Sequence, residues 1–109
     1  MTKMIRHLVL FKVRPEIDVS QFQLLMQEIA DLRAAHSGIV GFEHGPNKTP
    51  ETRDQGYSYG FILTLGSWTD LALYQNDPNH QATGLKLLNA CHPDHAGILA
   101  FDMEVADKS

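Results

Sequence analysis

The chain has little of several residue types whose abundance would point to a function. Its only cysteine, Cys91, excludes an internal disulfide and fits a reducing compartment, so we expect a cytoplasmic protein. Its 9 basic residues are scattered and are outnumbered by 13 acidic ones, which gives a net charge of -4. This acidic balance argues against nucleic acid as a partner, because nucleic-acid-binding surfaces are usually basic.

Long apolar runs are also absent, and no segment approaches the length that a membrane-spanning helix needs. The first residues, MTKMIRHLVLFKV, have charges before apolar residues, as a signal peptide does. Their apolar run is too short, alternates with charges and lacks a small-residue cleavage site, so we interpret them as a strand. With 43% hydrophobic and 20% charged residues, the chain fits one globular domain, residues 1–109, without a membrane partner.

Cofactor and metal motifs are weak or missing. The segment GPNKTPETRDQG has glycines and a lysine, but not the spacing of a phosphate-binding loop. The segment CHPDH brings together residue types that bind zinc: Cys91, His92, Asp94 and His95. Its spacing differs from that of a structural zinc site, and there is no second cysteine pair. We therefore expect a polar loop here, no bound metal, and no dinucleotide, haem or other cofactor.

Alternation of apolar residues predicts four β-strands, at residues 4–14, 39–44, 57–65 and 98–105. In the first strand, one face carries Ile5, His7, Val9, Phe11 and Val13. In the second and third strands, one face carries Val40, Phe42 and His44, and Tyr59, Phe61, Leu63 and Leu65. In the last strand, we expect the core face to consist of Leu99, Phe101, Met103 and Val105.

Apolar residues spaced three and four apart predict helices at residues 18–36, 67–74 and 77–90. Each helix begins at a capping signal: Asp18 with Gln21, Ser67 with Asp70, and Asp77 followed by Pro78. The apolar stripe of the first helix consists of Phe22, Leu25, Met26, Ile29 and Leu32. In the last helix, we expect Leu85 and Leu88 to point inward.

The resulting order, βαββαβ, is that of a ferredoxin-like α+β fold, in which helices cover one face of an antiparallel sheet. The other face is expected to carry Leu8, Leu10, Ile62 and Ile98, which are too apolar to remain in water. The simplest partner for this face is a second copy of the chain, with the two sheets closing face to face around a two-fold axis. The pattern therefore predicts a homodimer through the sheet faces.

Four segments, taken in order, resemble the stress-responsive A/B barrel (Dabb) family: IRHLVLFKVRPE, GFEHGPN, GYSYGFILTLGSWTDLALYQNDPNH and ILAFDMEV. The resemblance implies a dimeric α+β barrel, in a family whose members mostly have no assigned activity. A plant branch, the olivetolic acid cyclase type, closes a linear polyketide by aldol condensation with a tyrosine and a histidine just before a helix. Tyr74 and His80 hold the matching positions, and His7 matches a pocket histidine of that branch. A second pocket histidine is replaced by Tyr59.

Two functions remain open. The first is a small homodimer that binds an apolar or phenolic ligand between sheet and helices, or serves in stress tolerance, without turnover. The second is a cofactor-independent cyclase-, lyase- or isomerase-like enzyme acting on a carbonyl compound. In it, His80 abstracts a proton next to the carbonyl and Tyr74 orients the ring or stabilises the oxyanion. The pocket is expected to be lined by His7, Val9, Phe42, Tyr59 and Phe61.

The same residues also have purely structural interpretations. His80 can hydrogen-bond the loop before its helix, and Tyr74 can pack as an amphipathic core residue. A lone histidine on an apolar strand face, such as His7, is more often a satisfied core residue. His36 and His44 are expected at the surface or at an edge.

Overall fold

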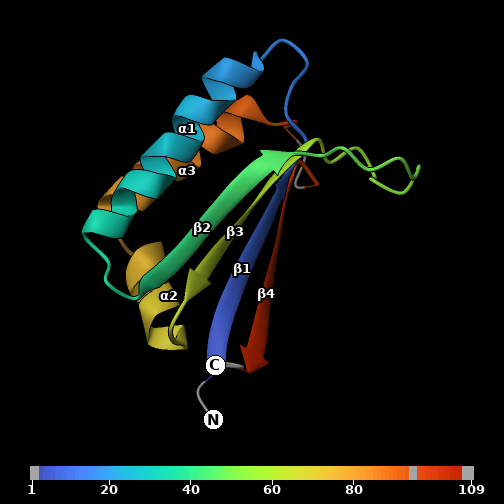
Figure 1. Ribbon diagram of the computed structural model, residues 1–109. Coiled ribbons are helices and arrows are strands. Elements are labelled where there is room, and N and C mark those ends of the chain that lie inside the picture. Colours follow the sequence, from blue (N-terminus) through green and yellow to red (C-terminus); the bar gives the residue numbers. More distant parts are fainter. Residues whose placement is uncertain (1–2, 94–95, 107–109) are drawn as a thin grey trace.

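The computed structural model describes residues 3–93 and 96–106. The elements in chain order are β1 (Lys3–Phe11), α1 (Val19–Asp31), η1 (Leu32–Ala34), β2 (Ile39–Pro46), β3 (Tyr59–Leu65), α2 (Trp68–Gln75), α3 (Pro78–Ala90) and β4 (Ile98–Ala106). The strands form one antiparallel sheet in the order β2-β3-β1-β4. The helices gather on one side of it, with α1 and α3 side by side (Figure 1). This is the ferredoxin-like α+β fold that the sequence predicts.

The core lies between the helices and one face of the sheet. On β1, the predicted alternation is confirmed, because Ile5, His7, Val9 and Phe11 are buried. Each stands opposite a residue of β3 that is buried as well, and residues directly opposite share a face. Phe22 of α1 closes the core with its ring 5.2 Å from that of Phe11. Burial of one such aromatic side chain stabilises the fold by about 1.5–3 kcal/mol.

The predicted helix starts are confirmed. The backbone N–H of Asp18 donates to Oε1 of Gln21 at 2.9 Å, as part of a capping box. At α2, Oγ of Ser67 accepts from the N–H of Asp70 at 3.1 Å. Such caps are each worth about 1 kcal/mol, because they satisfy N–H groups that have no partner inside the helix. The end of the first helix is less well predicted, since α1 gives way to the 3₁₀ turn η1 before His36.

The face assigned to the last strand was wrong. Leu99 and Phe101 of β4 stand opposite Leu10 and Leu8, so they lie on the face without helices, where they are 46% and 61% exposed. Met103 and Val105 share this face, whereas Ile98, which was expected on it, stands opposite Phe11 on the helix side. Alternation divides the residues of a strand into two sets on opposite faces, but it does not show which set points inward. In β4 the register with β1 decides which set is inward.

Two smaller expectations were also wrong. Leu85 and Leu88 of α3 point outward, at 64% and 58% exposed, and the buried positions are Thr83, Leu87 and Ala90. On the side of α3 that faces α1, Thr83 and Lys86 both donate to the carboxylate of Glu28.

In β2, a register shift between Ile39 and Gly41 leaves Val40 51% exposed. Val40 therefore does not share a face with Phe42 and His44, as was expected, and Ile39 is the buried residue on their side, because an irregularity of this kind changes the alternation of the strand.

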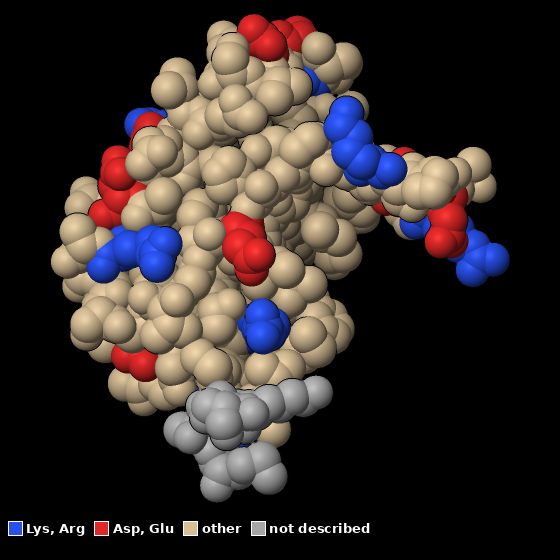
Figure 2. Space-filling model, in the orientation of Figure 1, with Lys and Arg blue, Asp and Glu red and all other residues tan. Residues whose placement is uncertain are grey.

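The sheet face without helices is mostly apolar. Figure 2 views the molecule from this side, and few charged side chains lie over the strands. Within the described strands, the register places only two charged residues on it, Arg6 of β1 and Glu43 of β2. We call it the open face; its apolar members are Met4, Leu8, Leu10, Ile62, Leu99, Phe101, Met103 and Val105.

The segment between β2 and β3 projects from the body as an arm (Figure 1). A hollow of about 590 Å³ lies between this arm and the open face, with Leu8, Leu10 and Ile62 among its lining residues. The predicted polar loop over residues 44–56 is confirmed for the part after Pro46, where β2 ends. Within the described chain, no helix combines the length and apolar character needed to cross a membrane.

The CHPDH segment is described only in part. Cys91 is buried and pairs with Val13 in an isolated bridge, which joins the end of α3 to the segment after β1. His92 donates its backbone N–H to the carbonyl of Lys12 at 3.0 Å. Asp94 and His95 lie outside the described residues, and among those that are described no cluster of three or more His, Cys, Asp or Glu side chains forms a metal-binding group.

Candidate functional site

A cavity of about 210 Å³ lies between the sheet and α3. Its walls are mostly apolar, and its polar side chains are His7 of β1, Tyr74 and Gln75 of α2, and His80 of α3. Mostly apolar walls with a few polar groups are typical of small-molecule sites. Of the residues that the sequence pointed to, the cavity brings together His7, Val9, Phe61, Tyr74 and His80.

Tyr74 lies near the end of α2 and is completely buried. Its ring centroid is 4.3 Å from that of His80 and 6.1 Å from that of His7. Among the described residues, its hydroxyl is the buried side-chain group without a hydrogen-bond partner. Burial raises the pKa of Tyr74 well above its usual range, so the phenol stays protonated. The unpaired hydroxyl of this cavity-lining residue is therefore a neutral O–H donor.

His80 is the third residue of α3, where Pro78 begins the helix. Nδ1 of His80 lies 3.3 Å from the carbonyl oxygen of Gln75. Burial lowers the pKa of His80, and the nearby rings of His7 and His36 act in the same direction. The imidazole is therefore neutral near pH 7, which a general base requires.

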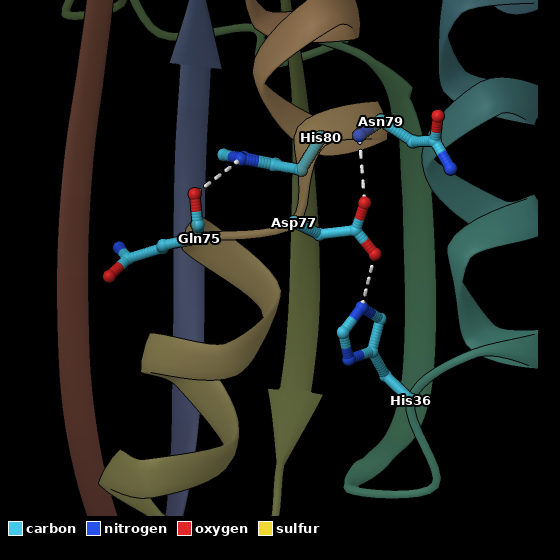
Figure 3. Close-up of polar contacts among 5 residues, drawn as sticks. All are labelled: His36, Gln75, Asp77, Asn79 and His80. Atoms are coloured by element: carbon cyan, nitrogen blue, oxygen red, sulfur yellow. Dashed lines mark hydrogen bonds and ion pairs between the residues drawn. The ribbon is translucent and has the colours of Figure 1, made fainter.

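Asp77 fixes the start of α3 and thereby the place of His80. Figure 3 shows its two carboxylate oxygens meeting different partners: Oδ1 accepts from the N–H of Asn79 at 2.7 Å, and Oδ2 lies 2.7 Å from Nε2 of His36. The hydrogen bond from His36 is the main reason why the pKa of Asp77 is lowered. His80 turns away from this carboxylate toward Gln75 (Figure 3). His36, expected at the surface or an edge, is instead half-buried and supports the helix cap.

A second carboxylate contacts the cavity through His7. Nδ1 of His7 lies 2.5 Å from Oδ1 of Asp102, which stands directly opposite on β4. With Asp102 ionised, Nδ1 carries the proton and Nε2 keeps its lone pair. Sequence reasoning missed Asp102, because it placed Phe101 and Met103 inward and thus turned Asp102 outward. The pairing of β1 with β4 is the signal that would have found it.

Two residues expected in the pocket lie outside this cavity. The hydroxyl of Tyr59 lies 2.6 Å from Nδ1 of His44, and its ring packs on Phe22 of α1 at 4.9 Å. The ring of Phe42 contacts Phe61 at 5.4 Å but does not reach the cavity. They lie at a different position across the sheet, toward β2 and α1, whereas the cavity lies under α3 beside β1 and β4.

Comparison with known proteins identifies the family. The family model of the Stress Responsive A/B Barrel Domain (Dabb) matches residues 5–105. The chain belongs to this family. No curated protein matches it. The Dabb chain is also 32% identical to a dimeric ferredoxin-like protein of unknown function from Jannaschia sp. CCS1, over 94% of this chain and 99% of that one, with a TM-score of 0.86.

More distant structures share the fold. A hydroxynitrile lyase from Passiflora edulis is 15% identical, with 100% of this Dabb chain and 99% of that chain covered and a TM-score of 0.83. A dimeric ferredoxin-like protein of unknown function from Thermobifida fusca is 20% identical, with 96% and 93% covered and a TM-score of 0.72. At these identities the likeness concerns the fold alone, because one fold supports many functions.

Proposed function

We propose that this Dabb protein binds a small phenolic or otherwise weakly polar aromatic ligand in the cavity between the sheet and α3. The observation that carries this is the hydroxyl of Tyr74, which is buried without a partner among the described residues. A buried hydroxyl without a hydrogen bond costs about 1–3 kcal/mol. A ligand oxygen in the cavity would remove this cost, so the unpaired hydroxyl favours a ligand with a polar atom at this end.

The size of the cavity limits the ligand. An apolar protein cavity of about 150 Å³ holds benzene. The cavity here, of about 210 Å³, therefore fits one aromatic ring with a short substituent. Nε2 of His7 and Nε2 of His80 can accept a hydrogen bond from a phenol, and the hydroxyl of Tyr74 can donate one to a carbonyl oxygen, so both kinds of oxygen substituent suit the polar end.

Replacement of Tyr74 by phenylalanine tests this proposal. Tyr74→Phe removes the unpaired hydroxyl, so the ligand-free protein should become more stable by about 1 kcal/mol. Affinity for phenol and 4-methylphenol, measured by isothermal titration calorimetry, should fall by about tenfold, because one hydrogen bond to the ligand is lost. Wild-type protein that binds neither probe would count against the proposal. So would a Tyr74→Phe variant that binds both probes as tightly as the wild type does.

A second candidate function, proton transfer on a carbonyl compound, is favoured by the two imidazoles on the cavity. In this reaction neutral His80 removes a proton from the carbon next to the carbonyl, and the electrons of the C–H bond form an enolate. The Tyr74 hydroxyl donates to the developing oxyanion. The enolate carbon then either recovers the proton or attacks a second carbonyl of the same molecule, whose alkoxide takes the proton from His80.

Deuterium exchange tests this second candidate. Incubation of 4-hydroxyacetophenone with the protein in heavy water should replace the methyl protons, as followed by proton NMR. His80→Ala should abolish the exchange while the free energy of unfolding stays near that of the wild type. Equal exchange by both proteins would leave only the binding function.

We also propose that the protein is a homodimer in which two open faces pack together. The apolar character of that face supports this, since exposed apolar patches of such extent mark interaction surfaces. Arg6 and Glu43 add charges of opposite sign, which a two-fold axis can pair between copies. The similar structures from Jannaschia and Thermobifida fusca are described as dimeric.

A further inference from the structure

The glycine in the middle of α3 has no explanation in the fold itself. Gly84 is helical, and glycine weakens a helix relative to alanine because it has more conformational freedom to lose. A Cβ atom added at Gly84 would meet nothing within 4 Å. Gly38 differs, since a Cβ there would lie 2.1 Å from Cγ of Asp70. Neither backbone conformation nor close packing therefore requires a glycine at position 84.

Because Gly84 has no side chain, it leaves space in the cavity. Gly84 lines the cavity, one helical turn after His80 and just before Leu87, so these three residues form the α3 wall. Ile98 and Ala100 of β4 line the same cavity. The space that a side chain at position 84 would occupy is therefore part of the cavity volume beside His80.

We infer that Gly84 is the residue that sets the size of the ligand, and that the space above it receives a single aromatic ring. This inference rests on the proposed binding function. The aromatic ring of the ligand lies against α3 at Gly84, and its oxygen substituent reaches the polar end of the cavity at Tyr74 and His80. A larger residue at position 84 fills the ring's place without touching the polar groups.

Variants of graded size test the inference. Gly84→Ala adds one methyl group, and Gly84→Leu fills most of the space beside the helix. Asn89→Leu is the control, because it places the same leucine side chain at an exposed position of the same helix. Binding of phenol and of 4-ethylphenol is measured by isothermal titration calorimetry on the purified protein, and folding is checked by circular dichroism and thermal unfolding.

We expect Gly84→Leu to weaken phenol binding by more than about tenfold, as steric exclusion in an apolar pocket does. Gly84→Ala should bind phenol nearly as well as the wild type but lose about tenfold in affinity for 4-ethylphenol, since one methyl group then competes with the ethyl chain. Gly84→Ala should also unfold at a higher temperature, because alanine favours the helix and fits open space. Asn89→Leu should bind both probes like the wild type.

The outcomes separate the two proposals. Wild-type protein that binds neither phenol nor 4-ethylphenol would overturn the binding function itself, and with it the role of Gly84. Wild-type binding that survives unchanged in both Gly84 variants would overturn the role of Gly84 alone. If Gly84→Leu does not fold, the preference of Gly84→Ala between phenol and 4-ethylphenol decides, because equal affinity losses for both probes contradict a size limit.

Discussion

His7 of β1 and Asp102 of β4 form a directly opposed pair, with Nδ1 of His7 2.5 Å from Oδ1 of Asp102. The pair joins a buried imidazole to a carboxylate that is 30% exposed, so the histidine faces the cavity while its partner reaches toward solvent. Such a carboxylate fixes the tautomer of the ring and so decides which nitrogen is available in the cavity. Asp102 is therefore expected to act as a positioning residue for His7.

Asp102→Asn tests this relationship. An amide accepts a weaker hydrogen bond than a carboxylate does, so the free energy of unfolding should fall by about 1 kcal/mol. The loss is small because the carboxylate is partly exposed. Urea unfolding gives this value, and ¹⁵N shifts of the ring report the tautomer. In the wild type, Nδ1 should carry the proton; in the variant, a mixture is expected. Asp31→Asn, on the exposed side of α1, should change neither, and an unchanged tautomer in Asp102→Asn would contradict the role.

The lowered pKa of His80 predicts a pH dependence of folding. Burial holds the folded pKa below the ordinary value of 6.5, so the unfolded chain binds a proton at a pH where the folded chain does not. Stability should therefore decrease as the pH falls through about 6.5. His80→Gln should reduce this slope in denaturant titrations between about pH 7 and about pH 5. The exposed His92 provides the control, and His92→Gln with an equal effect would refute the assignment.

Asp77 gives the folding stability a second pH dependence. It lies at lower pH than that of His80, because the group is a carboxylic acid rather than an imidazole. Its pKa is lowered from the ordinary 3.8, chiefly by the hydrogen bond with His36. The stabilisation it provides is therefore complete above the unfolded pKa and is lost as the pH falls through the folded one. Asp77→Asn should flatten the acid side of the stability profile between about pH 5 and about pH 2. His36→Gln should flatten it in part, whereas an unaltered profile in both variants would contradict this account.

The open face predicts how the chain assembles. Phe101→Asp places a charge on the proposed interface, and burying an unpaired charge is costly, so the variant should sediment as a monomer in analytical ultracentrifugation. Leu88→Asp is the matched control, because Leu88 is similarly exposed but lies on the helix side. The wild type and the control should both sediment as dimers. A wild type that sediments as a monomer would remove the proposed assembly.

Local signals in the sequence were sufficient for the order of elements and for most of their ends. Helix starts at Asp18, Ser67 and Asp77 depend on residues a few positions apart, which a single sequence displays directly. Tyr74 and His80 are a similar case, because a short helix break brings their rings to 4.3 Å.

Residues whose role depends on distant pairing were harder to predict. Asp102 and Ile98 were assigned to the wrong face because both faces of β4 carry apolar residues, so only the register with β1 distinguishes them. His36 is 41 positions away from Asp77, and no local pattern indicates that they meet. Leu85 is exposed because α3 turns Thr83, Leu87 and Ala90 inward, and the leucines of its sequence occur on both sides of the helix, so its own pattern did not identify the buried side.

The burial of Cys91 between the end of α3 and the segment after β1 has a practical consequence. Burial raises the pKa of the Cys91 thiol to about 11, so almost none of it is thiolate at neutral pH, and alkylating reagents attack the thiolate. Because the chain has no other sulfhydryl, the rate at which iodoacetamide labels the protein measures how often this junction opens. The native sequence thus carries its own reporter of local unfolding, and no engineered label is needed.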